Sequence, residues 1–158
     1  MTLDELLARE AIRATMAKYN VSGDRLKVDD FAACFTEDGV IESEESPGVY
    51  KFRYASRAAI HAWQSRWLNR EPGADTVHKA SFVRHHLSTC HIELTGPDSA
   101  RARTYWTAWT DIGPDHCGYY LDRFRKVGEE WLIAHRTVRL DWEAENGLFK
   151  SAIANTEG

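Results

Sequence analysis

Residues 118–138, GYYLDRFRKVGEEWLIAHRTV, contain two β-rich runs that are separated by the short polar turn GEE. Runs rich in aromatic and β-branched residues around such a turn are typical of a β-hairpin. In the first run Tyr120, Asp122 and Phe124 occupy alternate positions, so they share one face of the strand. The stretch therefore predicts two antiparallel strands, the first of which has a face that mixes aromatic and acidic side chains.

Two more β-rich runs precede this hairpin, and the turn sequences GPDS and GPDH connect them. The four runs are residues 82–94, 100–112, 117–127 and 131–142. Short connections between successive strands imply an antiparallel meander. A brief additional strand is predicted nearer the N-terminus, at residues 39–43.

Helical patterns occupy the part of the chain that precedes the meander. Thr2 and Glu5 have the spacing of a capping box, which predicts a helix that runs to about Tyr19. The segment DDFAACF at residues 29–35 predicts a short second helix, and residues 57–69 predict a third. The apolar stripe of the third helix consists of Ile60, Trp63 and Trp67.

Together these elements predict an α+β fold, a cone in which N-terminal helices pack on a strongly curved, mostly antiparallel sheet and enclose a pocket. Polar and aromatic residues occur on both faces of the strands, which favours a pocket on one face and a partner subunit on the other. We expect one domain over residues 1–158, because no repeat or change of composition divides the chain. Residues 143–158 offer few anchors and are expected to form a flexible tail.

The composition disfavours several classes of partner. A net charge of −4 offers no positive field for nucleic acid or for an anionic membrane surface. No signal-peptide pattern and no apolar run of the ~20 residues that span a bilayer is present, so a cytoplasmic location is expected. The cysteines are widely spaced and form no C-x-x-C pair, which is typical of reduced thiols: Cys34, Cys90 and Cys117.

Motifs for nucleophilic, phosphate-binding and metal-dependent chemistry are absent from the sequence. Neither G-x-S-x-G nor a glycine-rich phosphate loop occurs. Several histidines lie close together, but the adjacent pair His85 and His86 must point to opposite faces of a regular strand. We therefore expect neither a metal site nor a cofactor.

Over residues 3–142 the chain resembles the SnoaL-like domains of the nuclear transport factor 2-like superfamily. The similarity rests on the helix with Tyr19, the break at Gly23-Asp24, DDFAACFTEDGV, RHHLS, ARARTYW and above all residues 118–138. Within the superfamily, scytalone dehydratase and hexachlorocyclohexane dehydrochlorinase resemble the chain at two positions that matter for chemistry. Asp24 follows the first helix as their catalytic aspartate does, and His85 precedes Glu93 by the spacing of their catalytic histidine.

The resemblance implies a cofactor-independent lyase or isomerase that acts on a small, apolar, cyclic or polyketide-like molecule. His85 would be the general base and Asp24 would orient it. Scytalone dehydratase has a tyrosine immediately before its aspartate, whereas this chain has Gly23, so a tyrosine-assisted departure of water does not carry over. The superfamily also implies two alternatives: a non-catalytic binding or assembly module, and the small subunit of a ring-hydroxylating dioxygenase.

The parity of the strand at residues 82–94 leaves the choice of histidine open. If Ile92 and Leu94 face the core, strict alternation places His86 on that side instead of His85. A β-bulge between Leu87 and His91 would reverse the parity and turn His85 inward. His86 is the substitute if the strand is regular.

Further residues are expected to line the pocket, where aromatic rings provide contact area and polar groups provide orientation. The predicted substrate-binding set is Tyr19, Trp63, His86, Trp106, Tyr120, Asp122 and Phe124. Asp122 has a structural alternative, an ion pair with Arg136 on the next strand. Three arginines are expected on the exposed or interface side of the sheet: Arg84, Arg103 and Arg123. By resemblance, we expect a homodimer or homotrimer that forms through the sheet.

Overall fold

The computed structural model describes residues 1–43, 51–68 and 80–148. Its helices are α1 (Leu3–Asp24), α2 (Val28–Ala32) and α3 (Arg57–Ser65). Its strands are β1 (Phe35–Ser43), β2 (Arg53–Ala55), β3 (Arg84–Gly96), β4 (Ser99–Thr110), β5 (Gly113–Val127) and β6 (Glu130–Glu143). The predicted α+β class, with helices first and a long meander after them, is confirmed.

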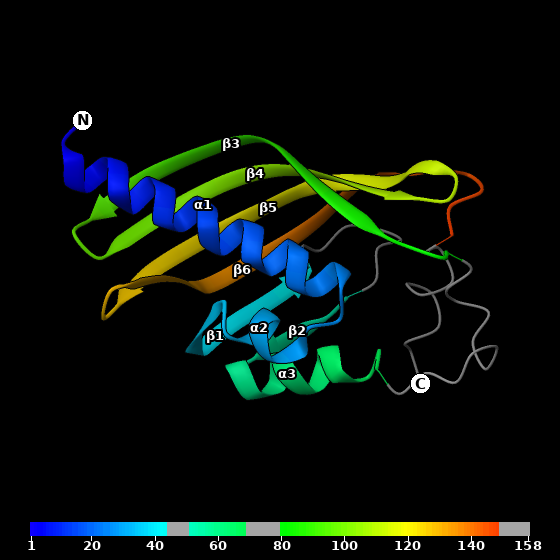
Figure 1. The fold of residues 1–158 in the computed structure, drawn as a ribbon, viewed down its shortest axis with the longest axis horizontal. Coiled ribbons are helices and arrows are strands. Elements are labelled where there is room, and N and C mark those ends of the chain that lie inside the picture. The colour runs from blue at the N-terminus through cyan, green and yellow to red at the C-terminus, as the bar shows by residue number, and fades with distance from the viewer. Residues whose placement is uncertain (44–50, 69–79, 149–158) are drawn as a thin grey trace.

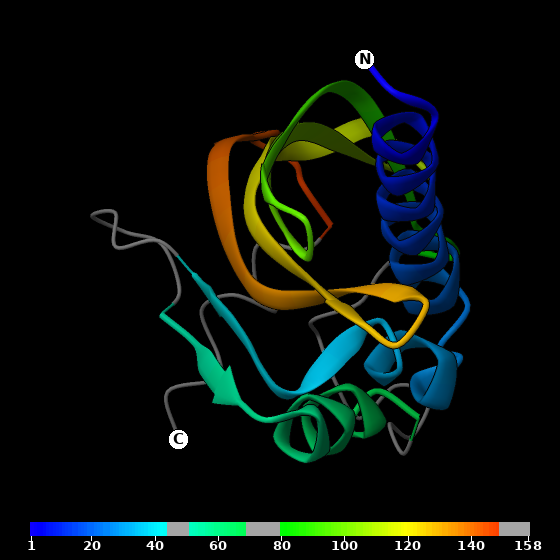
Figure 2. The same ribbon diagram turned by 90° about the vertical axis from the view of Figure 1, so that its left-hand side faces the viewer.

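The described strands form a six-stranded mixed sheet in the order β2-β1-β6-β5-β4-β3. Strands β3 to β6 make the predicted antiparallel meander, and β1 pairs with β6 in parallel. Helix α1 runs along the strands of the meander (Figure 1). Seen along its length, the sheet curves strongly, and α1 lies along the open side of the curve (Figure 2). The inner face of the sheet is therefore the face that α1 covers.

Helix α1 begins as predicted but ends later. The Thr2 hydroxyl accepts a hydrogen bond from the Glu5 backbone N–H at 3.2 Å, and the Glu5 carboxylate accepts one from the Thr2 backbone N–H at 2.7 Å. The helix passes the expected end at Tyr19 and continues through Gly23 to Asp24. A Cβ at Gly23 would lie 3.3 Å from the Phe31 ring, so the glycine lets α2 pack closely against α1. Asp24 is therefore held in the last turn of a long helix.

Other element boundaries in the structure also differ from the predicted ones. The short second helix ends at Ala32 instead of Phe35, and β1 begins at Phe35 instead of Gly39. Strand β1 begins early because Phe35 pairs with Ile133 of β6, a contact distant in sequence. Helix α3 ends at Ser65, and Asn69, its predicted end, falls outside the described residues. Of the predicted tail, residues 143–148 are described, with Glu143 at the end of β6, whereas 149–158 are not.

The core between α1 and the inner face of the sheet is mainly apolar, but it contains a buried ion pair. Arg136 is fully buried, and its guanidinium donates two hydrogen bonds of 2.8 Å to the Asp122 carboxylate. The guanidinium carbon lies 4.1 Å from the centroid of the Tyr19 ring and 4.0 Å from that of Tyr120. The structural alternative for Asp122 is thus the observed one. Phe124, 2% exposed, is also part of this core.

Gly118 of β5 lies opposite a β-bulge in β6, where there is no room for a larger side chain. Its partner Leu140 is followed by an extra residue on β6 before Trp142 pairs with Cys117. A Cβ at Gly118 would lie only 1.8 Å from the backbone oxygen of Arg139. Substitution by alanine must therefore move the backbone of one of the two strands.

We expect Gly118→Ala to lower the free energy of unfolding by about 1–3 kcal/mol, the usual cost of overpacking. Gly96→Ala is the matched control, because a Cβ at Gly96 would meet only the flexible Ser99 side chain. Urea denaturation of both variants measures the difference. If both variants lost the same free energy of unfolding, the steric conflict at Gly118 would not be the cause.

Candidate active site

A β-bulge in β3 determines which histidine faces the core. Leu87 pairs with Trp106 and Cys90 pairs with Thr104, so three residues of β3 span the distance of two residues of β4. Of the two alternatives left open by the sequence, the structure therefore has the bulge, and His85 lies on the inner face together with Ile92. His86 lies on the outer face, where its ring centroid is 5.8 Å from that of Trp109. The placement of His86 in an inner pocket is thereby corrected.

Asp24 and His85 meet at the end of α1, although they are 61 positions apart. The His85 Nδ1 atom lies 2.5 Å from Oδ1 of Asp24, and the His85 backbone N–H donates to Oδ2 at 2.9 Å. The side chain of Asp24 is 7% exposed and that of His85 is 28% exposed. One carboxylate therefore orients both the ring and the backbone of His85. The other ring nitrogen, Nε2, has no hydrogen-bond partner within residues 1–43, 51–68 and 80–148.

A second histidine, His116, lies near His85 on the other side of Ala108 in the intervening strand β4. His85 and His116 both pair with Ala108 of β4, and their ring centroids are 6.3 Å apart. The His116 Nδ1 atom lies 2.8 Å from the carboxylate of Asp115, which is 1% exposed. Thr110 and the backbone N–H of Leu148 donate to the same carboxylate, at 3.2 and 2.7 Å. Two histidines, each bonded to a carboxylate, therefore face one another.

His116 is the functional candidate that the sequence reasoning missed. The segment GPDH at residues 113–116 was expected to form a turn, but β5 already begins at Gly113. The turn is shorter because Gly113 adopts a φ of 90°, a conformation that glycine tolerates at no steric cost. The sequence contained one signal that could have identified His116. It is the Asp-His dipeptide at a strand end, which the meander aligns with His85.

Burial lowers the pKa of His116, and the nearby His85 lowers it further, while the hydrogen bond to Asp115 opposes the shift. The folded protein therefore binds this proton less readily than the unfolded chain does. It follows that the free energy of unfolding falls as the pH drops below the ordinary histidine value of 6.5.

We expect His116→Gln to make the free energy of unfolding decline less between about pH 7 and pH 5 than it does in the wild type. Urea denaturation at several pH values across this range provides the measurement. The same decline in both proteins would argue against the assigned pKa shift.

The aromatic residues that were predicted to contact substrate divide into two groups. The ring of Trp106 lies beside both histidines, with its centroid 6.0 Å from that of His85 and 5.5 Å from that of His116. Tyr120 stacks on Trp106 at 5.7 Å, and burial raises its pKa well above 10.0, so it stays a neutral hydroxyl. Trp63 lies elsewhere, stacked on Tyr54. Tyr19 belongs to the Arg136 core, and burial raises its pKa too.

Two buried donors, one on β4 beside the histidines and one on α1, lack an acceptor within the described part of the chain. They are Nε1 of Trp106 and Nδ2 of Asn20, and Asn20 lies one turn before Asp24 on α1. A buried donor without an acceptor costs about 1–3 kcal/mol. A bound molecule that presents an oxygen would remove this cost.

Among the residues that the structure describes, no group of three or more His, Cys, Asp or Glu side chains could hold a metal ion. None of the described helices is long and apolar enough to span a membrane.

The fold is that of the nuclear transport factor 2-like class of proteins. The chain belongs to the family of SnoaL-like domains, whose family model matches residues 4–137. No curated protein is significantly similar to it in sequence.

Solved structures share this fold at low sequence identity. A proposed scytalone dehydratase from Novosphingobium aromaticivorans is 23% identical, with a TM-score of 0.71 over 92% of this chain and 91% of that one. The beta subunit of a proposed aromatic-ring-hydroxylating dioxygenase from the same organism is 18% identical, with a TM-score of 0.72 over 93% and 97%. Hexachlorocyclohexane dehydrochlorinase from Novosphingobium barchaimii is 13% identical, with a TM-score of 0.70 over 90% and 92%. At these identities the similarity establishes the fold alone.

Proposed function

We propose that the protein is a cofactor-independent lyase or isomerase in which His85 removes a proton from a small substrate. The observation that carries this proposal is the double contact of Asp24 with the ring and the backbone N–H of His85. When Nδ1–H donates to the carboxylate, the lone pair of the imidazole is on Nε2, where a general base needs it. The carboxylate also stabilises the imidazolium that forms when the proton is taken.

His116 supplies a second proton-transfer group within reach of the same ligand. In an elimination, His85 takes a proton from carbon, a double bond forms, and the bond to the leaving group breaks. A leaving hydroxyl needs a proton of its own, which His116 would donate, because its ring centroid lies 6.3 Å from that of His85. In an isomerisation, the imidazolium of His85 returns its proton to another atom of the substrate.

The surroundings of the histidines favour a substrate with an oxygen on an apolar frame. The unpaired N–H groups of Trp106 and Asn20 are suited to a carbonyl or hydroxyl oxygen. The rings of Trp106 and Tyr120 provide apolar contact area. Two neighbours are named for eliminations, a dehydration and a dehydrochlorination, which agrees with a cyclic or polyketide-like substrate.

A non-catalytic assembly role is the second candidate, and the outer face of the sheet favours it. Tyr105 and Trp109 are each 44% exposed there, and Trp142 is 50% exposed. Such aromatic residues are enriched at protein interfaces. This face would serve the expected homodimer or homotrimer, or a larger catalytic partner as in the dioxygenase neighbour.

A turnover screen separates the two candidates. The purified protein is incubated without added metal or cofactor with a panel of cyclic β-hydroxy ketones, enolisable ketones and aromatic polyketide-like compounds. Proton NMR in D2O then detects loss of water, double-bond migration or deuterium incorporation. Reaction that requires His85 supports the catalytic proposal, whereas reaction that is equal in His85→Gln, or absent throughout the panel, favours the assembly role.

A further inference from the structure

A groove of about 460 Å³ crosses the outer face of the sheet, on the side opposite Asp24 and His85. It is lined by His91, Glu93, Arg101, Ala102, Arg103, Leu121, Asp122, Arg123, His135 and Thr137. The cross-strand register aligns these positions in two rows over β3, β4, β5 and β6. Cavities of roughly 300–1,000 Å³ accommodate small molecules. The size of the groove therefore suits a compact ligand.

The charged side chains that face this groove are mainly cationic. Arg101 lies directly opposite Arg123, an arrangement of like charges that destabilises a sheet. Arg101 is compensated by the carboxylate of Glu93, which accepts two hydrogen bonds at 2.9 and 3.0 Å. The carboxylate of Asp122 is turned to the inner face, where it pairs with Arg136. Arg103 and Arg123 are thus left without a carboxylate partner in the described part of the chain.

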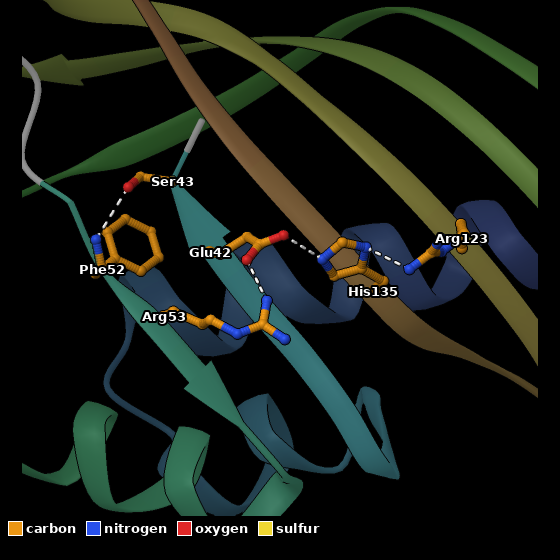
Figure 3. A network of polar contacts seen from close by, with 6 residues as sticks. All are labelled: Glu42, Ser43, Phe52, Arg53, Arg123 and His135. Atoms are coloured by element: carbon orange, nitrogen blue, oxygen red, sulfur yellow. Dashed lines mark hydrogen bonds and ion pairs between the residues drawn. The ribbon is translucent and has the colours of Figure 1, made fainter. Parts of the chain in front are cut away.

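Arg123 is nevertheless held in place by a chain of polar contacts (Figure 3). Its Nη2 donates to Nδ1 of His135 at 2.8 Å, and Nε2 of His135 lies 2.6 Å from the Glu42 carboxylate. A guanidinium can only donate, so Nδ1 accepts and Nε2 carries the hydrogen that Glu42 receives. Arg53 pairs with the same carboxylate. Burial of Glu42 opposes ionisation, but the hydrogen bonds from Arg53 and His135 outweigh it and lower its pKa.

Two preorganised cations result from these contacts. The remaining N–H groups of Arg123 have no acceptor among the described residues. The guanidinium of Arg103 belongs to the neighbouring row, and its carbon lies 3.8 Å from the centroid of the Tyr119 ring. Stacking restrains an arginine while leaving its N–H groups free to bind. Oxyanions are the ligands that a pair of restrained guanidinium groups recognises most strongly.

We propose that this groove is a second ligand site, which binds a small molecule through a carboxylate or phosphate group held by Arg103 and Arg123. The site is separate from the Asp24–His85 pair, because the two lie on opposite faces of the sheet. It therefore does not depend on the catalytic proposal. His135 and Glu42 are positioning residues that hold Arg123.

Isothermal titration calorimetry tests the site with two probes, inorganic phosphate and citrate, at low ionic strength. We expect saturable binding of at least one probe, and the one that binds more tightly identifies the class of anion. Arg103→Gln and Arg123→Gln should each raise Kd by at least about tenfold, as expected for loss of one charged hydrogen bond. Sedimentation velocity checks that the variants keep the oligomeric state of the wild type.

Two controls make the result specific. Arg125→Gln removes the same charge from the same strand, but Arg125 pairs with Asp38 and does not line the groove. Asp24→Asn alters the inner face alone. Both variants should bind the probes as the wild type does. The proposal would be overturned if neither probe showed saturable binding. It would also be overturned if Arg125→Gln weakened binding as much as Arg123→Gln does.

Discussion

Replacing His85 with glutamine is expected to lower kcat by about 10²–10⁴-fold on any compound that the wild-type protein converts, the usual contribution of a general base. Glutamine keeps a polar side chain of similar reach but cannot take up the substrate proton. Asp24→Asn should cause a comparable loss. An amide can donate to Nδ1 and stabilise the wrong tautomer of the ring, with the lone pair turned away from Nε2.

A further Asp–His pair, which lies on the protein surface, serves as the control. His61 Nε2 lies 2.8 Å from Asp29 on the surface, where the side chains are 44% and 98% exposed. Asp29→Asn and His61→Gln make the same chemical changes at the protein surface, outside the candidate site. Initial rates and circular dichroism of all four variants are compared. If the surface variants lose as much activity as His85→Gln and Asp24→Asn, the proposed base is wrong.

Asp122→Asn is expected to reduce the free energy of unfolding by about 3–5 kcal/mol, the cost of breaking a buried ion pair from one side. The substitution leaves the volume of the side chain unchanged. It removes the negative charge that compensates Arg136, whose guanidinium is enclosed by Tyr19, Tyr120 and the carboxylate itself. Chemical denaturation provides the measurement.

Two comparisons show whether charge compensation is the cause. Glu93→Gln breaks an ion pair with Arg101 that is exposed to solvent, and it should cost less than about 1 kcal/mol. The double variant Asp122→Leu with Arg136→Met should be more stable than Asp122→Asn, because no buried charge is left unpaired. A double variant less stable than the single one would contradict this account.

Secondary structure and the fold class were largely predictable, because they depend on local patterns. The capping box at Thr2 and the alternation around Tyr120 each place an element without reference to the rest of the chain. The bulge in β3 was left open by the sequence, since strict alternation favoured His86 and only the resemblance favoured His85. Element boundaries that depend on distant contacts could not be predicted. An example is the early start of β1, where Phe35 pairs with Ile133.

The candidate site shows the same division. Asp24 and His85 were identified from a resemblance, since 61 intervening positions carry no information about a distance between them. The proximity of His116 depends on the register of three strands, which brings two histidines to either side of Ala108. The assignment of Asp122 to the core instead of a pocket depends on Arg136, since a buried carboxylate needs a partner of opposite charge.

By itself the sequence determined the order of helices and strands, the polar and apolar faces of each element, and the residue types that could transfer a proton. Those properties follow from steric preferences and from the periodicity of a few neighbouring residues. Only the tertiary structure decided which charges are paired, that two Asp–His pairs face one another, and that Arg103 and Arg123 share a groove. These arrangements depend on strand register and sheet curvature, and a shift of a single residue in register would move each side chain to the other face.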